Sequence, residues 1–404
     1  MNILIIPSWY PKDKNPINGI FTKEQAIAIA EENKNIVNVI VAKWDNGYSE
    51  ISLRKPYKIP KTIFKFLTSK TEDKQITDNF YEFFTPTLTW SKRLPFGGVN
   101  RIYFSVRKTV ERVLDKFGKI DIIHAHVSYP AGFVAYKISK EFNIPYVITE
   151  HMSLFPFKSL LKGNKPIDEI IIAFQNANRT IAVSSPLCNR IRSFGLSCTD
   201  VVPNLVDETK FYSSDKKNDI FTFLTVCMIK DQKGIDILLY AISKLDKNLI
   251  SKTQFIIGGD GPKLDEYKSL ARKLGLNNVH FIGRVDRNKA PRLFSSSHVY
   301  VMPSRHESFG VVFAEAIASG LPVIATRCGG PEDIVNESNG ILLDVDDIEG
   351  LSKAINYMFE NYNKYNPKII REDFEKRFSK KAVVSQLMSI YNEVSQDVRN
   401  SRDY

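Results

Sequence analysis

The chain has 404 residues, of which 43% are hydrophobic and 25% charged, and its formal net charge is +11. This length is too great for one ordinary domain and suits two domains of medium size, each able to bury its own core. The composition is that of a globular protein and excludes a disordered class. A membrane-spanning class is excluded because no apolar run approaches the roughly 18 residues that a spanning helix needs.

The first residues and the cysteines indicate where the protein works. Met1–Pro7 offers a short apolar run without a basic segment or a cleavage site before or after it, so we expect a first strand and no export signal. The four cysteines are scattered without CxxC or Cys/His spacing: Cys188, Cys198, Cys227 and Cys328. We therefore expect a reducing compartment, a cytoplasmic location and no zinc site.

Short β-branched or apolar runs alternate with longer helical patterns, which predicts parallel sheets with crossover helices and the α/β class. The strands expected in the first half are 2–6, 37–42, 121–124, 145–149, 180–184 and 200–203. Those expected in the second half are 221–226, 254–258, 280–282, 298–302, 322–325 and 340–343. The polar segment 207–219 is the expected linker, giving domains over 1–209 and 210–380. A last helix within 381–404 has no strand after it and must dock on structure already built.

The positive charge is concentrated in residues 51–120, which hold fifteen Lys or Arg and six Asp or Glu. Within it, residues 101–117 predict an amphipathic helix with a basic face, formed by Arg101, Lys108, Arg112 and Lys116. Before it, basic residues alternate with aromatic and aliphatic ones, a mixture that suits an anionic lipid surface; they are Arg54, Lys55, Lys58, Lys61 and Lys65. A solvated basic face over a core helix is the ordinary alternative, and nucleic acid ranks last because no recognised module accompanies the charge.

The strongest chemical signal is in the second half, where residues 303–310 follow an expected strand and lead into a helix from about Val311. Glu307 and Glu315 lie eight residues apart, so one carboxylate lies on the loop and the other about two turns into the helix. Each can then reach a different part of one extended ligand. Carboxylates bind sugar hydroxyls well, because they accept charge-assisted hydrogen bonds from them.

Together with residues 316–326 and Gly329-Gly330-Pro331-Glu332, the two carboxylates resemble the E-x7-E region of family 4 glycosyltransferases. The resemblance covers nearly the whole chain and implies the GT-B fold, with two Rossmann-like domains facing a cleft and the last helix packing back on the first. It implies a retaining, metal-independent transferase without cofactor that uses a nucleotide-sugar donor, for which a UDP-sugar is expected. By resemblance, Glu307 would contact the transferred sugar and Glu315 the ribose. The backbone that would contact the sugar or phosphates belongs to Ser308, Phe309 and Gly310.

Lys233 is the expected diphosphate ligand, since it follows a strand and enters a helix in the segment 226–234. In the family an arginine five residues earlier often completes the phosphate clamp, but this chain has Met228 there. Either another cation such as Lys230 or Arg284 acts with Lys233, or the phosphate site is weaker. Met228 itself is expected to be packed.

Three further segments resemble donor-site loops. Gly259 and Gly261 follow a strand and would let the backbone approach the nucleotide, and Arg284 lies in the stretch that would read the base. Gly19, in the loop after the first strand, would let a backbone amide reach the diphosphate. A turn or cap role is the alternative for each glycine.

The segment Asp121–His126 ends a strand with two histidines, which we expect to point to opposite faces. The resemblance assigns His126 to the active site, with a positioning role toward the transferred sugar, and leaves His124 as a core histidine. His151, after the following strand, resembles an acceptor-side position, with a structural role about equally expected. No third ligand is spaced to make a metal site.

The acceptor is inferred from the resemblance, which includes Ser8–Pro11 and points to bacterial surface polysaccharide assembly. We expect a glycan or a polyprenyl-diphosphate-linked glycan at the inner face of the cell membrane. One rival is a non-catalytic nucleotide-sugar-binding or membrane-associated scaffold protein. The presence of Met228 in place of the family's arginine favours it. A GT-B-like epimerase would need acid/base groups that are not apparent, and a dehydrogenase would need a G-x-G-x-x-G after the first strand.

Overall fold

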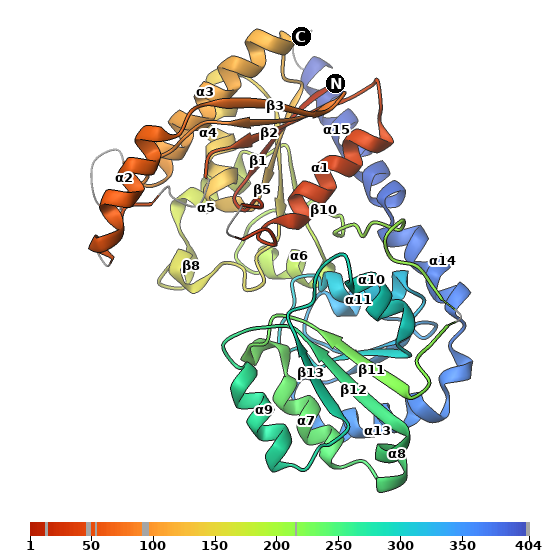
Figure 1. Cartoon of the computed structure of the whole chain (residues 1–404). Coiled ribbons are helices and arrows are strands. Elements are labelled where there is room, and N and C mark those ends of the chain that lie inside the picture. Colours follow the sequence, from red (N-terminus) through yellow and green to blue (C-terminus); the bar gives the residue numbers. More distant parts are fainter. Residues whose placement is uncertain (13–14, 46–49, 53–54, 91–96, 215, 401–404) are drawn as a thin grey trace. The chain divides into compact units, whose positions relative to one another are not determined.

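The computed structural model describes residues 1–12, 15–45, 50–52, 55–90, 97–214 and 216–400. Arg54, one of the predicted basic residues, lies outside these ranges. The chain forms two compact units, each built on its own sheet (Figure 1). The first unit comprises Met1–Val183, Cys188–Val202 and the chain from Val383, and the second comprises Ser184–Leu187 and Pro203–Ala382.

The first unit contains an eight-stranded sheet of order β10-β9-β6-β5-β1-β2-β4-β3. Its strands are β1 (Asn2–Pro7), β2 (Asn38–Lys43), β3 (Glu72–Thr77), β4 (Phe80–Phe84), β5 (Ile122–His126), β6 (Tyr146–Glu150), β9 (Arg179–Ala182) and β10 (Asp200–Val201). All neighbours are parallel except β3 and β4, which form an antiparallel edge pair. The central strands are buried on both faces, as expected for a parallel sheet covered on both sides.

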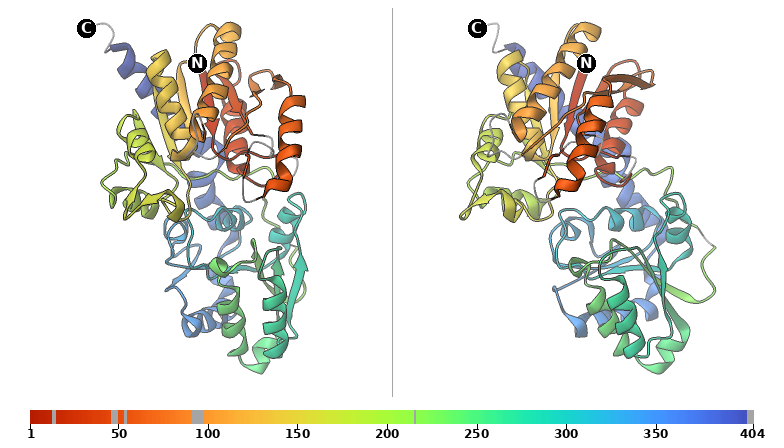
Figure 2. Two further views of the ribbon diagram at one scale, coloured as in Figure 1. Left: turned by 90° about the vertical axis from the view of Figure 1, so that its left-hand side faces the viewer. Right: turned by 60° about the vertical axis from the view of Figure 1, so that its left-hand side comes forward.

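Helices cover both faces of this sheet (Figures 1 and 2). The helices of this unit are α1 (Ile20–Glu32), α2 (Ile59–Thr68), α3 (Val99–Phe117), α4 (Phe133–Phe142), α5 (Asp168–Gln175), part of α6 (Ser185–Arg192) and most of α15 (Lys380–Asn400). Of these, α2 lies away from the sheet and buries only Thr62. Shorter elements are η1 (Pro56–Lys58), η2 (Ser128–Gly132), η3 (Lys158–Leu160), β7 (Leu161–Lys162) and β8 (Lys165–Pro166). The helix predicted at 101–117 is confirmed, since Ile102, Val106 and Val110 of α3 are buried in the core that α4 also lines.

The second unit contains a six-stranded, fully parallel sheet of order β13-β12-β11-β14-β15-β16. Its strands are β11 (Phe221–Val226), β12 (Thr253–Gly258), β13 (Val279–Gly283), β14 (Val299–Met302), β15 (Val323–Thr326) and β16 (Gly340–Leu343). Its helices are η4 (Asp231–Lys233), α7 (Ile235–Ser243), α8 (Lys247–Lys252), α9 (Leu264–Lys273), α10 (Ala290–Ser296), α11 (Val311–Ala318), α12 (Pro331–Ile334), α13 (Ile348–Glu360), η5 (Tyr362–Lys364) and α14 (Pro367–Phe378). The core includes the stacked rings of Phe223 and Phe255, whose centroids lie 4.8 Å apart.

The last helix packs on the first unit, as predicted. Val383, Leu387, Tyr391 and Val394 of α15 are buried. The hydroxyl of Tyr391 lies 2.6 Å from Nδ1 of His124 on β5, across 267 residues of sequence. The helix therefore supplies both apolar surface and a hydrogen-bonding partner to the first sheet.

The limits of the units lie a few residues from the predicted domain limits. The chain enters the second unit at Pro203 and leaves it after Ala382, where the sequence pattern placed the changes at 210 and 381. The short segment Ser184–Leu187 also belongs to the second unit, because the hydroxyl of Ser184 donates a hydrogen bond of 2.6 Å to the carbonyl of Ser308. No spacing rule predicts such an excursion. Among the described residues, no helix is both long and apolar enough to cross a membrane.

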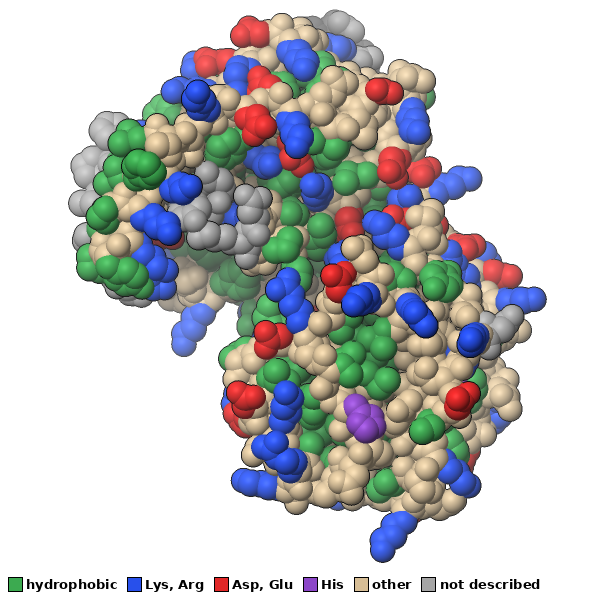
Figure 3. Space-filling model, viewed as in Figure 1, with side chains coloured by type: hydrophobic (Ala, Val, Ile, Leu, Met, Phe, Trp, Pro, Cys, Tyr) green, Lys and Arg blue, Asp and Glu red, His purple; other side chains and the backbone are tan. Residues whose placement is uncertain are grey.

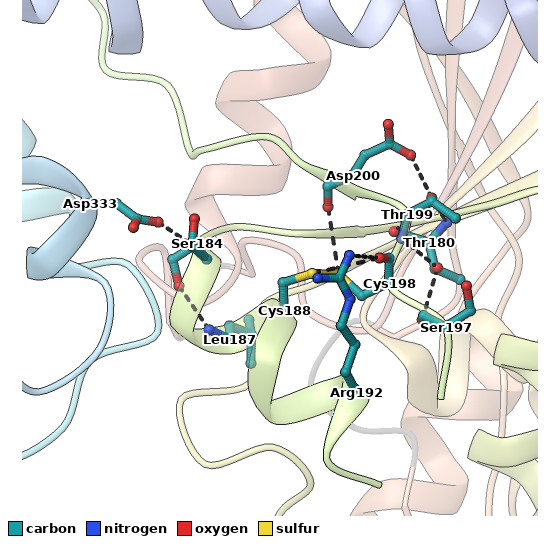
Figure 4. Close-up of a disulfide and its surroundings, with 11 residues drawn as sticks. Thr180, Ser184, Leu187, Cys188, Arg192, Ser197, Cys198, Thr199, Asp200 and Asp333 are labelled. Carbon is teal, nitrogen blue, oxygen red and sulfur yellow. Dashed lines mark hydrogen bonds between the residues drawn. A yellow bond between two sulfur atoms is a disulfide. The ribbon is translucent and has the colours of Figure 1, made fainter. Parts of the chain in front are cut away.

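Cys188 and Cys198 form a disulfide, with their Cα atoms 5.6 Å apart (Figure 4). The cysteine spacing did not indicate this pair, because the two residues are ten apart in sequence and meet only through α6 and the turn after it. The cysteines therefore give no support to a reducing compartment. Cys227 and Cys328 are free thiols, and burial raises the pKa of each to about 12.

Candidate active site

In the second unit, Arg305 fixes the loop that follows β14. Its guanidinium donates hydrogen bonds of 3.0 and 2.7 Å to the two carboxylate oxygens of Asp236 on α7 and one of 2.7 Å to Asp346. A fourth, of 2.6 Å, goes to the carbonyl of Asp231 in η4. Hydrogen bonding to Asp236 raises the pKa of Arg305, so the charge is permanent. A two-pronged contact fixes the direction of the loop as well as its distance, and it holds the loop against the start of α7.

The loop that Arg305 holds brings Lys233 and Glu307 together. The ammonium of Lys233 pairs with Oε1 of Glu307, and the hydroxyl of Ser304 donates a hydrogen bond of 2.8 Å to the same oxygen. The Glu307 amide donates to the carbonyl of Cys328, and its carbonyl accepts from Gly330, each at 3.0 Å. Among the described residues, Oε2 of Glu307 has no donor. The carboxylate is thus held firmly by one oxygen and offers the other.

The loop after Glu307 turns into α11 with its amides unused. Phe309 is buried, its ring 5.7 Å from that of Phe378, and Gly310 has φ 85°, where a Cβ would lie 2.7 Å from the ring of Phe313. Within the described chain, the amide groups of Ser308, Phe309 and Gly310 have no acceptor. Three adjacent amides at the start of a helix are suited to an anion or a hydroxyl-rich ligand.

Glu315 lies on α11 and is 8% exposed, the same fraction as Glu307. The two carboxylates lie near the same buried ring: burial raises the pKa of Tyr300, and the charges of Glu307 and Glu315 add to the rise. Of the three residues that the sequence pattern singled out most strongly, Lys233 and Glu307 form an ion pair, and Glu315 lies in the same unit with its charge acting on the same ring as Glu307. Their roles toward a sugar and a ribose stay predictions.

The cations near Lys233 differ in their surroundings. Met228, expected to be packed, is 62% exposed, because it lies on the loop after β11 and not in the strand. Lys230 is half-buried, and burial together with the charge of Lys233 lowers its pKa, so the two ammonium groups are neighbours. Lys230 forms no ion pair with any described residue. Arg284 is exposed and follows β13 at the sheet edge, two strands away from β11.

The glycines of the loop after β12 let two backbones approach closely. A Cβ on Gly259 would lie 1.9 Å from the carbonyl oxygen of Cys227, and one on Gly261 would lie 2.2 Å from that of Ile229. These glycines therefore pack the loop after β12 onto the loop after β11. Their contact with a nucleotide stays a prediction.

Gly19 has a similar packing role in the first unit. It precedes α1 with φ 69°, and a Cβ there would lie 2.2 Å from the carbonyl of Trp9. In the same loop the hydroxyl of Tyr10 donates a hydrogen bond of 2.6 Å to Glu82. The predicted contact of Gly19 with a diphosphate is not tested by this arrangement.

The two histidines of β5 lie on one face of the first sheet, with ring centroids 4.2 Å apart. The prediction of opposite faces is wrong, because residues two apart on a strand point the same way. His124 is satisfied in the core by the hydroxyls of Tyr391 and Thr149, at 2.6 and 2.7 Å. Burial lowers its pKa to about 3, so it is neutral at physiological pH.

His126 contacts His151 through Nδ1 and Nε2, 3.0 Å apart, so one of these rings donates the hydrogen and the other accepts it. Burial lowers the pKa of His126 well below its ordinary value, and the neighbouring histidines lower it further. Nε2 of His126 is buried without a hydrogen-bond partner among the described residues. His126 is therefore a neutral ring with one nitrogen unused.

Glu150 positions this histidine pair, a role that the sequence did not reveal. Its carboxylate is buried and accepts hydrogen bonds from the amide and hydroxyl of Ser128, at 3.0 and 2.5 Å, and from the amides of His151 and Met152, both at 2.8 Å. Burial raises its pKa. The carboxylate ties the loop after β5 to the loop after β6. The signal in the sequence that could have revealed this role is a glutamate at the end of a buried strand.

Comparison with known proteins adds to this geometry. Residues 206–377 match the family model of glycosyl transferases group 1, and residues 71–210 match that of Glycosyltransferase Family 4. The chain belongs to the family 4 glycosyltransferases. The glycosyltransferase is 28% identical over 305 residues to an uncharacterized glycosyltransferase of Methanocaldococcus jannaschii, covering 74% of this chain and 82% of the other.

A further relative and a solved structure cover more of the chain. The glycosyltransferase is 25% identical to the putative teichuronic acid biosynthesis glycosyltransferase of Bacillus subtilis, over 93% of each chain. The structure of Anabaena HepE in complex with UDP has a TM-score of 0.70 at 19% identity, over 97% of this chain and 100% of that one. The fold is GT-B, as predicted.

No group of three or more His, Cys, Asp or Glu side chains within the described ranges is placed to hold a metal ion. In the first unit the rings of His124, His126 and His151 lie next to one another. In the second unit Glu307 pairs with a lysine, and Glu315 lies on a helix. Metal independence stays a prediction.

Proposed function

We propose that the glycosyltransferase moves a hexosyl or N-acetylhexosaminyl group from a UDP-sugar to a glycan or polyprenyl-diphosphate-linked glycan, with retention of configuration and without a metal. The observation that carries the proposal is the Lys233–Glu307 pair beside the unused amides of Ser308, Phe309 and Gly310. The UDP complex of HepE supports the donor class. The Bacillus relative, named for teichuronic acid biosynthesis, supports the acceptor class.

Glu307 would bind the transferred sugar through Oε2. Oε1 is already held by Lys233 and Ser304, so the second oxygen is positioned to accept hydrogen bonds from sugar hydroxyls. Glu315 would bind the ribose from α11. Gly259, Gly261 and Arg284 would lie along the nucleotide.

Lys233 would bind the diphosphate next to the sugar. An ammonium has three donors, and only one is needed for Glu307. Lys230, a neighbouring cation without an acid partner, would supply the positive charge that the family places at the position of Met228. Both lysines and the helix amides would stabilise the negative charge that grows on the leaving diphosphate.

The transfer itself would be a front-face substitution. The bond from the anomeric carbon to the diphosphate oxygen breaks, the bond to the acceptor oxygen forms on the same face, and the departing phosphate takes the acceptor's proton. No protein nucleophile is needed in this scheme. In the first unit, the unused Nε2 of neutral His126 would position a sugar hydroxyl, with His151 on the acceptor side.

The acceptor proposed here lies at the cytoplasmic face of a membrane, so we also propose peripheral contact with anionic lipid. Two other functions remain to be tested against transfer. A scaffold protein would bind a nucleotide sugar without turnover, and an epimerase would change the configuration of the sugar while leaving it on the nucleotide.

The test is a panel of UDP-, GDP- and ADP-sugars incubated with the purified chain, with and without a chelator, followed by detection of free nucleotide and sugar. We expect slow hydrolysis of a UDP-sugar that the chelator leaves unchanged. Glu307→Gln should reduce this hydrolysis on the order of a thousandfold, because a charged contact to the reacting sugar is lost. Glu337→Gln, which changes an exposed carboxylate in the same unit, is the matched control.

Near-normal hydrolysis by Glu307→Gln, with an unchanged melting temperature, would contradict the assignment. Tight binding of a donor without hydrolysis or transfer would favour the scaffold. An epimerised nucleotide sugar among the products would favour the epimerase.

A further inference from the structure

The helix α2 exposes large apolar side chains together. Phe64 is 63% exposed and Leu67 73%, and Tyr57, just before the helix, is 74% exposed. Ile63 is 38% exposed, and Thr62 is the one buried residue of α2. Single exposed apolar residues are ordinary on protein surfaces, but several on one short helix mark an interaction site.

The exposed apolar side chains share one arc of the helix. With about 100° between successive residues, Ile63, Leu67 and Phe64 fall within an arc of about 100°, and Thr62 lies on the other side. Lys61 lies about 60° beyond Phe64 at the edge of this arc, and Lys65 lies about 40° further round the helix. The apolar surface of α2 thus extends well beyond the side that packs on the protein.

Every charged residue of the segment 57–70, which contains this helix, is basic. Residues 57–70 contain Lys58, Lys61, Lys65 and Lys70 and no acidic residue. Lys58 and Lys61 form no ion pair with any residue that the structure describes. Figure 3 shows hydrophobic and basic side chains next to one another over α2, at the left of the view.

The basic face of α3, in contrast, is largely used within the protein. Arg112 pairs with Asp73 at 2.8 Å and donates a hydrogen bond of 3.0 Å to the hydroxyl of Thr85. The ammonium of Lys116 lies 4.7 Å from the ring centroid of Tyr81. Arg112 and Lys116 therefore pack on β3 and β4, and lipid contact by the basic face of α3 stays a prediction.

We propose that α2 is a docking helix that lies on an anionic lipid surface, with Phe64, Leu67 and Tyr57 among the acyl chains and Lys58, Lys61 and Lys65 at the phosphate groups. The combination favours lipid over a protein partner, since the cores of protein interfaces are depleted in lysine. The inference deepens the membrane contact of the proposed function and does not depend on sugar transfer.

The test measures co-sedimentation of the full chain with vesicles of phosphatidylcholine alone and of phosphatidylcholine with about 30% phosphatidylglycerol. We expect binding to the anionic vesicles that weakens in about 0.5 M salt. The triple variant Lys58→Gln, Lys61→Gln, Lys65→Gln should bind them about a hundredfold more weakly, since each lysine near an anionic surface strengthens binding about fivefold. Phe64→Ser with Leu67→Ser should weaken binding about tenfold or more, because two buried apolar groups are lost.

The matched control is Ile36→Ser with Ile369→Ser, which removes apolar side chains that are 70% and 50% exposed elsewhere. It should bind as the unaltered chain does. The proposal is overturned if the unaltered chain ignores anionic vesicles, if the α2 variants bind like it, or if the control loses as much binding as they do. Donor hydrolysis should be the same in all four proteins, so its absence throughout would count against the proposed function alone.

Discussion

The carboxyl ends of the two sheets carry opposite kinds of chemistry. In the second unit the strands end on an ion pair, Lys233 with Glu307, whose side chains keep 14% and 8% of their surface exposed. In the first unit β5 ends on neutral rings, and His126 has no exposed surface. An ion pair can exchange one partner for a charged ligand, whereas a buried neutral ring can only offer a hydrogen bond. Under the proposed function, the anionic diphosphate would therefore bind to the second unit, and the first unit would contribute only a neutral hydrogen bond.

The most severe test of this comparison removes the cation of the second unit. Lys233→Met should lower kcat/KM for donor hydrolysis about a thousandfold, because the diphosphate loses its main charge and Glu307 loses its partner. Lys230→Met should cost about tenfold, mainly in KM. Lys273→Met, at an exposed position on α9, is the control in the same kinetic assay. Losses from Lys230→Met no larger than those of Lys273→Met would remove Lys230 from the phosphate site.

A smaller effect is expected when the neutral ring of the first unit is changed. His126→Gln should lower kcat about tenfold without changing the pH profile between about pH 5.5 and about pH 8.5, because burial keeps His126 uncharged throughout. The measurement is kcat for transfer or hydrolysis across this range. If kcat of the unaltered chain changes with pH in this range and that change disappears in His126→Gln, then His126 transfers a proton. The description of the first unit as offering only a neutral ring would then be wrong.

The smallest effect concerns stability. The pKa of His124 falls from 6.5 to about 3 on folding, so the unfolded chain binds the proton first as the pH falls below 6.5. The free energy of unfolding should therefore decrease by about 1.4 kcal/mol per pH unit below that point for this residue. Burial raises the pKa of Glu150, whose contribution has the opposite sign and is lost as the pH rises through its shifted value.

Urea unfolding at several pH values, followed by circular dichroism, measures this slope. His124→Asn should reduce it by about 1.4 kcal/mol per pH unit, while Tyr391→Phe should lower stability and keep the slope. An unchanged slope in His124→Asn would mean that the ring is not held neutral by the fold.

Regular elements of the fold could be predicted where the pattern is local. The strands Phe221–Val226 and Gly340–Leu343 and the helix beginning at Val311 have the predicted bounds. The edge strand β3 was missed, because all six of its residues are exposed and largely polar and give no apolar period. Its partner β4 was missed although Phe80–Phe84 is an apolar run that is buried in the sheet. The histidine faces were mispredicted although the two-residue period of a strand decides them.

The candidate site was predictable only in part, for a related reason. Glu307, Glu315 and Lys233 lie in recognisable local patterns, but what holds them does not. Arg305 reaches partners 41 and 69 residues away, and Glu150 and Ser184 act through loops whose proximity exists only after folding. Residues expected to contact a ligand are therefore easier to recognise from sequence patterns than residues that hold other side chains and loops in place.

The helix α15 has a consequence for how the protein is made. Most of the first unit precedes the second unit in the chain, but Tyr391, whose hydroxyl satisfies His124, is synthesised 267 residues after that histidine. Until Tyr391 is synthesised, the face of β5 that α15 covers stays exposed. The second unit can already form, because all of its residues, up to Ala382, precede the part of α15 that belongs to the first unit. During synthesis the half that starts first is thus completed last, and a nascent chain that stops before Val383 leaves that sheet open to aggregation or proteolysis.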